Sequence, residues 1–300
     1  MGEFKSGFVS IIGRTNVGKS TLVNSLVGEK VAITTDKRQT TRTAIRAIVN
    51  RENSQIVFID TPGIHKPKTK LGETMNETAW GSIPDVDVLL FIVEATSDKI
   101  GKGDLLVLEK IKEKNKKTIL VINKIDLIEK EKLLKLMDMY SKDYNFESII
   151  PISALKNENT DKILDEIEKH IPEGPAYYDI EEYTDQTARQ LMEESIREKA
   201  LKLLDQEVPH GILVEVEKMS LRKTSKGQDI YDVEATIFVL RKTHKGIVIG
   251  KDGSMLKRIG MYARQDMERT LDTKINLKLW VKVKEDWQDN QSIIKRFKSE

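Results

Sequence analysis

The most restrictive feature of the sequence is an alternation of short apolar runs and helical repeats from residue 8 to about residue 170. The runs are rich in Val and Ile, as buried strands are, and they cover residues 8–12, 44–49, 55–59, 88–93, 118–122 and 148–152. Between the runs, apolar residues recur at helical spacing, and Gly28 is placed to end the first of these helices. This alternation predicts an α/β domain in which helices on both faces cover a mostly parallel sheet.

The alternation stops at Pro172-Glu173-Gly174-Pro175, a composition typical of a linker. Beyond it the expected elements are a helix over 186–207, strands over 212–222 and 230–241 with a turn at 226–227, a helix over 254–271, a strand over 275–283 and a short closing helix. This order predicts a smaller α+β domain. We therefore place a first domain at 1–172, a linker at 173–183 and a second domain at 184–300.

The composition agrees with a globular chain and excludes several other classes. The 300 residues are 39% hydrophobic and 33% charged, which argues against long disorder. The chain has no cysteine, so disulfides and thiolate metal sites are excluded. Its longest apolar run, 88–93, is far shorter than the ~20 residues that cross a bilayer. The net charge is only +2, but residues 241–264 hold seven Lys and Arg against one acid, which predicts a local positive surface.

The segment from Gly13 to Ser20 fits the pattern G-x-x-x-x-G-K-[ST] and lies between a predicted strand and a predicted helix. In such a loop backbone N–H groups curl around phosphate oxygens, and the helix N-terminus adds a positive dipole. Lys19 can reach the β- and γ-phosphates, and the hydroxyl of Ser20 can bind Mg²⁺. We expect nucleotide contacts from Gly13, Arg14, Thr15, Asn16, Val17, Gly18, Lys19, Ser20 and Thr21. The loop alone leaves open whether the nucleotide is ATP or GTP.

A second segment, Asp60-Thr61-Pro62-Gly63, follows the predicted strand over 55–59. A carboxylate at the end of a strand beside the phosphate loop is placed to hold Mg²⁺ through water, and the Gly63 amide can donate to the γ-phosphate. By itself the sequence Asp-Thr-Pro-Gly is also an ordinary turn. Its place after the strand favours nucleotide contacts from Asp60, Thr61, Pro62 and Gly63.

A third segment, Asn123-Lys124-Ile125-Asp126, follows the predicted strand over 118–122. A carboxylate there can accept from both the N1–H and the 2-amino group of guanine, whereas adenine would leave Asp126 unpaired. Ser153 and Ala154 follow the next strand, where a backbone amide can meet the guanine O6. We therefore expect Asn123, Lys124, Asp126, Ser153 and Ala154 to bind the guanine of GTP or GDP.

Four motifs thus occur in one order: GRTNVGKS, DTPG, NKID and SAL, with the threonine segment QTTR between the first two. In this order they resemble the translation-factor-related GTPases. The second part of the chain contains a G-x-x-G loop, Gly250-Lys251-Asp252-Gly253, before a predicted helix. KH domains clamp the backbone of about four single-stranded nucleotides with such a loop. A GTPase domain followed by one KH domain closely resembles the bacterial Era GTPase family, over nearly the whole chain.

The resemblance implies a fold, a reaction and partners. The fold is an α/β P-loop GTPase domain followed by a type II KH domain. The reaction is hydrolysis of GTP to GDP, with Mg²⁺ held by Ser20, Thr41 and Asp60. The first switch contains Gln39-Thr40-Thr41-Arg42, and the second runs from Asp60 to about Gly72.

The resemblance also implies that the KH domain binds the 3′ end of the small-subunit ribosomal RNA and that the protein assists assembly of the small ribosomal subunit. It further implies a cytoplasmic protein with a loose peripheral association with the inner face of the cell membrane. We expect the chain to be a monomer.

Many GTPases place a glutamine directly after the glycine of Asp-x-x-Gly to orient the attacking water, but this chain has Ile64 there. We therefore expect slow intrinsic hydrolysis, with catalytic contributions from Lys19, Thr41, Gly63 and Asn16. Era-like GTPases with Asn at this loop position resemble those activated by potassium. The side-chain carbonyl of Asn16 could hold K⁺ near the transferring phosphate, where an arginine finger acts in other systems.

The G-x-x-G loop and the helix after it carry the expected RNA contacts: Gly250, Lys251, Asp252, Gly253, Lys257 and Arg258. A carboxylate that faced phosphate would repel it, so we expect Asp252 to point away or to cap the following helix. Trp280 lies in the predicted strand over 275–283, and we expect it in the core rather than stacked on a base.

Two other functions fit the same motifs. The chain could be a KH adaptor whose nucleotide is structural, in which case RNA would not stimulate steady turnover. It could also be a membrane-associated GTPase whose basic surface meets anionic lipid. The intact G-x-x-G loop favours RNA, since lipid binding has no need of two glycines at that spacing.

Overall fold

The computed structural model describes residues 3–37, 40–206 and 208–297. Contacts divide the chain into two compact units. The first comprises Met1–Ala32, Thr41–Asp185 and Lys295–Glu300, and the second comprises Ile33–Thr40 and Gln186–Ile294. The domain ranges expected from the sequence remain predictions. The observed division differs from them chiefly in assigning 173–185 to the first unit and 33–40 to the second.

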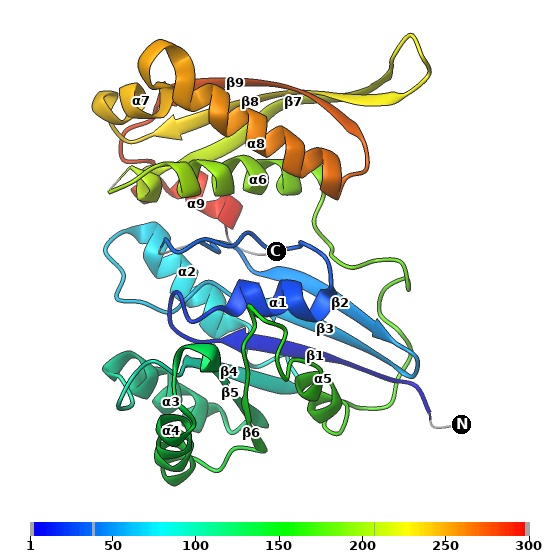
Figure 1. The fold of residues 1–300 in the computed structure, drawn as a ribbon, viewed down its shortest axis with the longest axis vertical. Helices are drawn as coiled ribbons and strands as arrows, with labels where there is room; N and C mark the ends of the chain where they lie inside the picture. Colours follow the sequence, from blue (N-terminus) through cyan, green and yellow to red (C-terminus); the bar gives the residue numbers. More distant parts are fainter. Residues whose placement is uncertain (1–2, 38–39, 207, 298–300) are drawn as a thin grey trace. The chain divides into compact units, whose positions relative to one another are not determined.

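The first unit holds a six-stranded sheet in the order β2-β3-β1-β4-β5-β6 (Figure 1). Its strands are β1 (Lys5–Ile12), β2 (Ile45–Arg51), β3 (Ser54–Asp60), β4 (Val88–Glu94), β5 (Thr118–Asn123) and β6 (Ser148–Pro151). The edge strand β2 runs antiparallel to β3, and the other described pairs are parallel. The predicted, mostly parallel sheet is therefore confirmed, and the carboxyl ends of its parallel strands meet at one edge, where ligands bind in such folds.

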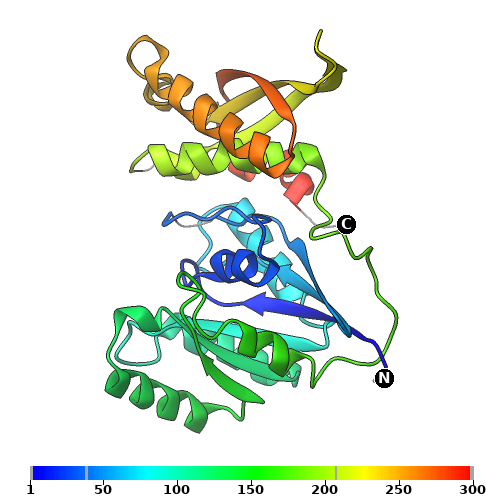
Figure 2. The same ribbon diagram turned by 45° about the vertical axis from the view of Figure 1, so that its right-hand side comes forward.

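Helices cover both faces of this sheet (Figure 2). They are α1 (Lys19–Val27), α2 (Lys70–Gly81), α3 (Lys102–Lys114), α4 (Lys130–Asp143) and α5 (Asp161–Ile167). Side chains of α1 and α5 share one core with Val9 and Ile11 of β1, while α2, α3 and α4 share the other with Ile12. This division follows from the alternation of side chains across a strand. Gly28 ends α1 in the left-handed conformation, as predicted.

The residues expected to form a linker are hydrogen-bonded to the sheet of the first unit. The amide of Ser6 donates to the Pro172 carbonyl at 3.1 Å, and the amide of Ile48 donates to Tyr183 at 3.0 Å. The buried side chain of Gln55 accepts from two further amides of the stretch, those of Tyr177 and Tyr178. Much of the stretch is thus fixed on the first unit.

The second unit contains a three-stranded sheet in the order β7-β8-β9 and the helices that pack on it. Its elements are α6 (Ala188–Leu203), β7 (Leu213–Lys223), β8 (Asp229–Val239), α7 (Lys242–Ile249), α8 (Ser254–Thr270), β9 (Lys274–Val283) and α9 (Gln291–Ile294). Strands β7 and β8 are antiparallel, and β8 and β9 are parallel. A capping box between Thr187 and Gln190 starts α6. The predicted α+β domain is confirmed.

The expectation that Trp280 lies in the core is wrong, because its side chain is 41% exposed. Along β9, Ile275 and Val281 are buried in the core of the unit. Successive side chains of a strand point to opposite faces, so Trp280, one residue before Val281, must face away from the helices. The alternation that predicted the strand already implied this orientation.

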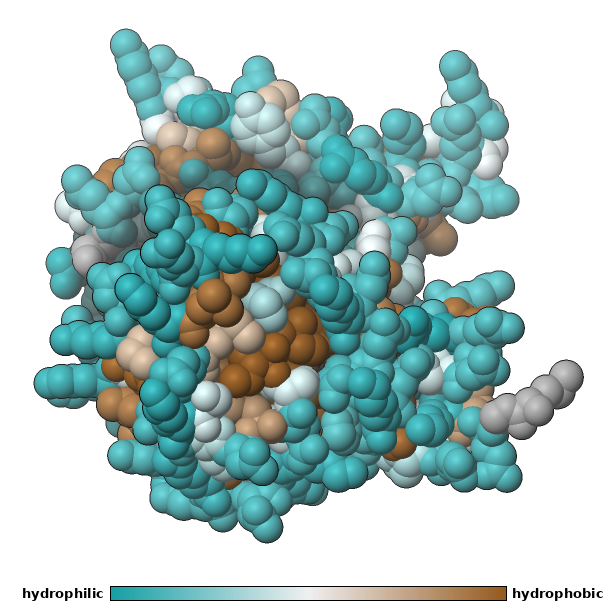
Figure 3. Space-filling model, turned by 60° about the horizontal axis from the view of Figure 1, so that its bottom comes forward, coloured by the Kyte–Doolittle hydropathy of each residue, from teal (hydrophilic) through white to brown (hydrophobic). Residues whose placement is uncertain are grey.

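The face of the molecule drawn in Figure 3 is mostly hydrophilic, with one apolar area near its centre. Large apolar side chains that are exposed on the first unit include Leu105, Leu106, Leu127, Leu134 and Leu155. Exposure of this kind is ordinary in folded proteins. Among the described residues, no helix combines the length and the apolar character that a membrane span requires.

Candidate functional site

The phosphate-binding loop lies between β1 and α1, as predicted, and Lys19 is the first residue of the helix. Only 6% of Lys19 is exposed, and its Nζ donates to the carbonyl oxygens of Gly13 at 3.1 Å and Arg14 at 2.9 Å. Burial lowers the pKa of Lys19 to about 8, an effect opposed by the nearby carboxylate of Asp60. A cation that is poorly hydrated and fixed in this way is suited to pair with a phosphate.

Three oxygen-bearing side chains meet beside the loop. The Ser20 hydroxyl donates to Oδ2 of Asp60 at 2.8 Å, and the Thr41 hydroxyl lies 2.9 Å from Ser20 and 3.4 Å from the same carboxylate oxygen. Asp60 is fully buried, which raises its pKa, while Lys19 and the two hydroxyls lower it. The other carboxylate oxygen, Oδ1, is buried without a hydrogen-bond partner among the described residues. Hydroxyl and carboxylate oxygens are the ligands that Mg²⁺ prefers. A buried carboxylate oxygen without a hydrogen-bond partner is also what a bound cation would satisfy, so the three side chains fit a Mg²⁺ site.

The second predicted segment lies directly against the phosphate loop. The amide of Ile64 donates to the Gly13 carbonyl at 3.1 Å, and the Thr61 hydroxyl donates to the Ile11 carbonyl at 2.6 Å. A Cβ at Gly63 would come within 2.7 Å of the Thr15 Cα, so only glycine allows this approach. Pro62 is buried in the same turn. The chain after β3 is thereby held directly against the phosphate loop.

The residues that were predicted to bind guanine come together at the ends of β5 and β6. Asn123 is buried, and its side chain donates to the Val17 carbonyl at 2.8 Å and accepts from the amides of Lys124 at 2.8 Å and Ala154 at 3.0 Å. One side chain therefore joins the phosphate loop, its own strand and the loop after β6. Asn123, predicted as a nucleotide contact, therefore also holds these three segments together, a role that the sequence did not predict.

The predicted guanine ligand, Asp126, is held by its neighbour. Its Oδ1 accepts from the Ser153 hydroxyl at 2.7 Å, and its side chain is 9% exposed. Lys124 has a positive φ of 68°, and its Nζ donates to the Asn16 carbonyl at 2.9 Å and to Glu94 at 2.7 Å. A carboxylate fixed in this way is preorganised to accept two parallel hydrogen bonds from a guanine.

Arg14 occupies a position that the sequence pattern did not anticipate. Its Nε donates to Oδ1 of Asp104 at 2.7 Å, so the side chain is directed to the start of α3, although its backbone belongs to the phosphate loop. Asp104 is only 2% exposed, and burial raises its pKa against the opposing effect of Arg14. A Cβ at Gly103 would lie 2.5 Å from the Arg14 Cδ. Nothing in the local sequence pointed to Asp104, because the contact joins residues 90 positions apart.

The other residues predicted to contact the nucleotide lie in the phosphate loop, at the start of α1 or in the threonine segment. Thr15, Val17, Gly18 and Thr21 lie in the loop or on the first turn of α1, and Val17 is buried in the core. Asn16 has a positive φ of 65°. Of the threonine segment, Thr40, Thr41 and Arg42 are described, and Gln39 lies outside the described residues. The structure thus brings together motifs that are far apart in the sequence, from Gly13 in the phosphate loop to Ala154 after β6.

The G-x-x-G loop connects α7 to α8 through a short 3₁₀ turn, η3 (Lys251–Gly253). Gly250 and Gly253 both have positive φ, of 73° and 75°. Lys251, Lys257 and Arg258 are exposed, as RNA contacts require. Asp252 is also exposed, with a φ of 52°. Of the two alternatives expected for Asp252, capping of α8 is contradicted, because the residue at the cap is Gly253, which has no side chain, and no side-chain hydrogen bond caps the helix.

The mostly parallel sheet, the phosphate loop and the cluster of Ser20, Thr41 and Asp60 define a P-loop GTPase, joined in one chain to a KH domain. The family model described as a 50S ribosome-binding GTPase matches residues 8–124, and the KH domain model matches residues 207–288. GTPase Era of Clostridioides difficile is 52% identical over 295 residues, which are 98% of each chain. GTPase Era of Clostridium kluyveri is 50% identical over 292 residues, 97% of this chain and 98% of the relative. This chain belongs to the GTPase Era family.

Two solved structures are similar over almost the full length. One is Era in complex with MgGDPNP and nucleotides 1506–1542 of 16S ribosomal RNA, with a TM-score of 0.93, 40% identity and 98% coverage of both chains. The other is a variant of Aquifex aeolicus Era bound to GDP and AlF₄⁻, with a TM-score of 0.93, 39% identity and coverage of 98% of this chain and 99% of the other. The resemblance expected from the motifs is confirmed, and so are the fold class and the GTPase reaction.

Proposed function

We propose that this chain is a GTP-hydrolysing switch that binds small-subunit ribosomal RNA near its 3′ end and assists maturation of the small ribosomal subunit. The observation that carries the proposal is the pairing of two preorganised sites in one chain. Asp126 and the Ser20, Thr41 and Asp60 cluster form a nucleotide site, and the glycine-rich turn at Gly250–Gly253 forms an RNA-binding loop. A relative with the same two domains holds both MgGDPNP and 16S ribosomal RNA.

In this proposal Ser20, Thr41 and Asp60 would hold Mg²⁺, which would supply positive charge to the β- and γ-phosphates. Lys19 supplies a second positive charge to those phosphates. Thr41 and Gly63 each hold one switch segment only while the γ-phosphate is present, so hydrolysis releases both segments. We therefore expect RNA affinity to differ between the GTP and GDP forms.

The test is crosslinking of the full chain to total RNA in the presence of a non-hydrolysable GTP analogue or GDP. We expect the small-subunit RNA 3′ end to be recovered and its yield to depend on the nucleotide. Recovery of unrelated RNAs, or equal yields with both nucleotides, would contradict the proposal. Steady-state GTP turnover measured with and without that RNA distinguishes the switch from a KH adaptor, since only a switch is stimulated.

Hydrolysis should depend on the monovalent cation, because Ile64 cannot orient water and Asn16 can help to hold K⁺ near the phosphates. We expect turnover to be about tenfold faster in KCl than in NaCl at equal ionic strength, as one well-placed charge can provide. Asn16→Gly should remove this difference, and glycine accepts the positive φ of the position without strain. GDP affinity of the variant is the control for an intact site. Equal wild-type rates in the two salts would refute the role of K⁺.

Peripheral association with the inner face of the cell membrane stays a prediction, as does the monomeric state. Flotation of the chain with anionic liposomes, repeated with an excess of RNA, tests the first. Sedimentation of the purified chain tests the second.

A further inference from the structure

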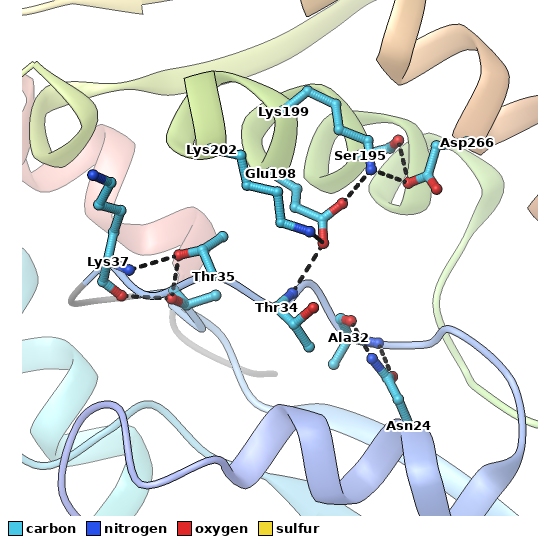
Figure 4. Close-up of polar contacts among 11 residues, drawn as sticks. Asn24, Ala32, Thr34, Thr35, Lys37, Ser195, Glu198, Lys199, Lys202 and Asp266 are labelled. Carbon is cyan, nitrogen blue, oxygen red and sulfur yellow. Dashed lines mark hydrogen bonds and ion pairs between the residues drawn. The ribbon is translucent and has the colours of Figure 1, made fainter. Parts of the chain in front are cut away.

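The two ends of the phosphate loop are fixed by the elements that flank it. The loop follows β1, an inner strand of the sheet, and Lys19 begins α1. Near the other end of α1 the side chain of Asn24 accepts from the amides of Val31 at 3.0 Å and Ala32 at 2.9 Å, and it donates to the Ala32 carbonyl at 2.8 Å (Figure 4). None of these contacts reaches the residues between β1 and α1, whose conformation depends on other parts of the first unit.

Arg14 lies in this stretch and is held through both its backbone and its side chain. Its carbonyl accepts from the Lys19 ammonium at 2.9 Å, and its backbone forms an isolated parallel bridge with Ile64. The side chain leaves the loop, and its Nε donates to Oδ1 of Asp104 at 2.7 Å. The guanidinium also lies 4.0 Å from Glu94, the last residue of β4. Charge-assisted hydrogen bonds of this length are among the stronger polar contacts in proteins, so Asp104 fixes the Arg14 side chain.

The position of Asp104 is itself strongly determined. The residue is buried in the first turn of α3, where the helix dipole favours a carboxylate. Burial raises the pKa of Tyr140 on α4, and the neighbouring Asp104 carboxylate raises it further, so Asp104 also lies against that helix. A buried carboxylate that lost its cation would be left uncompensated at a large cost. Asp104 and Arg14 therefore determine each other's position.

Two glycines at the start of α3 make room for this ion pair. A Cβ at Gly103 would lie 2.5 Å from the Arg14 Cδ, and a Cβ at Gly101 would lie 3.3 Å from Oδ2 of Asp104. Glycine inside a helix is unfavourable relative to alanine, because it loses more backbone freedom on folding. Gly103 stands inside α3 at the point where the arginine side chain passes. The first turn of the helix is thus shaped around Arg14.

Asn16, two residues further along the loop, is held by a second ion pair. The Lys124 ammonium donates to the Asn16 carbonyl at 2.9 Å and pairs with Glu94 at 2.7 Å. Glu94 therefore lies between the two cations that hold the loop, Lys124 and Arg14. The phosphate loop is thus bound at two places by cations whose carboxylate partners belong to the end of β4 and the start of α3.

We propose that Asp104 is a positioning residue for nucleotide binding, which acts through Arg14 on the phosphate loop. The ion pair holds the loop in the conformation in which its backbone N–H groups can surround the phosphates, so that binding does not have to order the loop. In this role the Arg14 side chain binds Asp104 rather than phosphate. The inference rests on the predicted contacts between the phosphate loop and the nucleotide.

Asp104→Asn removes the charge that binds Arg14 and keeps the size of the side chain. We expect the affinities for GDP and for a non-hydrolysable GTP analogue, measured by fluorescence titration, to fall by the same factor of about ten, because the pair restrains the loop with or without a γ-phosphate. The single-turnover rate at saturating GTP should change less than about twofold, since loss of uniform binding raises KM and leaves kcat unchanged. Asp165→Asn is the matched control, because Asp165 also pairs with an arginine, Arg51 at 2.9 Å, outside the predicted nucleotide site. It should bind both nucleotides as wild type does.

Arg14→Gln breaks the same ion pair from the other side and leaves α3 intact. It should weaken nucleotide binding as much as Asp104→Asn does, and the double variant should bind no more weakly than either, since both changes remove one interaction. Wild-type affinity in both single variants, additive losses in the double variant, or equal weakening by Asp165→Asn would overturn the inference. Failure of the wild-type chain to bind GDP or GTP would instead refute the predicted nucleotide site and the proposed function, so the two failures are distinguishable.

Discussion

Replacing Asp126 with Asn should weaken GTP binding by about 10²- to 10⁴-fold, the largest effect expected at the nucleotide site. The carboxylate is placed to accept two hydrogen bonds from guanine, each worth about 1.5–3 kcal/mol when one partner is charged. The Asn amide loses the charge and turns an N–H group toward either the 2-amino group or N1–H. The Ser153 hydroxyl that holds Oδ1 at 2.7 Å keeps the new side chain in the same place.

The same variant should gain affinity for xanthosine triphosphate, because xanthine carries an oxygen where guanine has its 2-amino group. An Asn amide can donate to that oxygen and accept from N1–H. Calorimetric titration of wild type and variant with the guanine, xanthine and adenine triphosphates measures both changes. Asp138→Asn is the control, since Asp138 is an exposed residue of α4 that pairs with Lys142. Unchanged GTP affinity in the Asp126 variant, or equal ATP and GTP affinity in wild type, would refute the assignment of the site.

Replacing Gly253 with Asp should lower RNA affinity by about 100-fold and leave GTP affinity unchanged. A second carboxylate in the G-x-x-G loop would face the phosphate backbone of the bound strand, and such a like-charge contact costs about 3 kcal/mol. The variant should still fold, because a Cβ at Gly253 meets no atom within 4 Å and Asp tolerates the left-handed conformation better than most residues.

Gly227→Asp is a close control for this experiment. Gly227 lies in the β7–β8 turn of the same unit, its φ of 77° nearly equals the 75° of Gly253, and a Cβ there also meets no atom within 4 Å. Both variants therefore carry the same added charge and a similar backbone strain. Fluorescence titrations with single-stranded RNA and with GTP compare them. Equal RNA affinity in both variants would show that the G-x-x-G loop is not the contact, and loss of GTP binding in Gly253→Asp would contradict the separation of the two sites.

Local patterns in the sequence were sufficient for the fold and for most of the nucleotide site. Strand and helix periodicity is encoded over a few residues, so the order of elements and the parallel sheet could be predicted. The phosphate loop and the segments after β3 and β5 follow strand ends, and parallel strands bring these ends to one edge of the sheet. The placement of Asp60, Ser20 and Asp126 at one edge of the sheet therefore follows from their positions after strand ends in the sequence.

Local patterns could not predict the contacts between residues that are far apart in the sequence. The pairing of Arg14 with Asp104 and the hold of Asn123 on three segments depend on how α3 and the loop after β6 pack, which no local motif records. Asp252 could not cap α8, because the residue at that cap is a glycine.

The sequence by itself was sufficient to predict two domains, the binding of a guanine nucleotide and a G-x-x-G loop of the kind that binds RNA. Each of these predictions depends on short motifs whose backbone geometry is local. Only the tertiary structure decided where residues 33–40 belong. The Thr34 amide and the Thr40 carbonyl are hydrogen-bonded to Glu198 and Arg197, which lie more than 150 positions away, and no local sequence pattern records contacts over such separations.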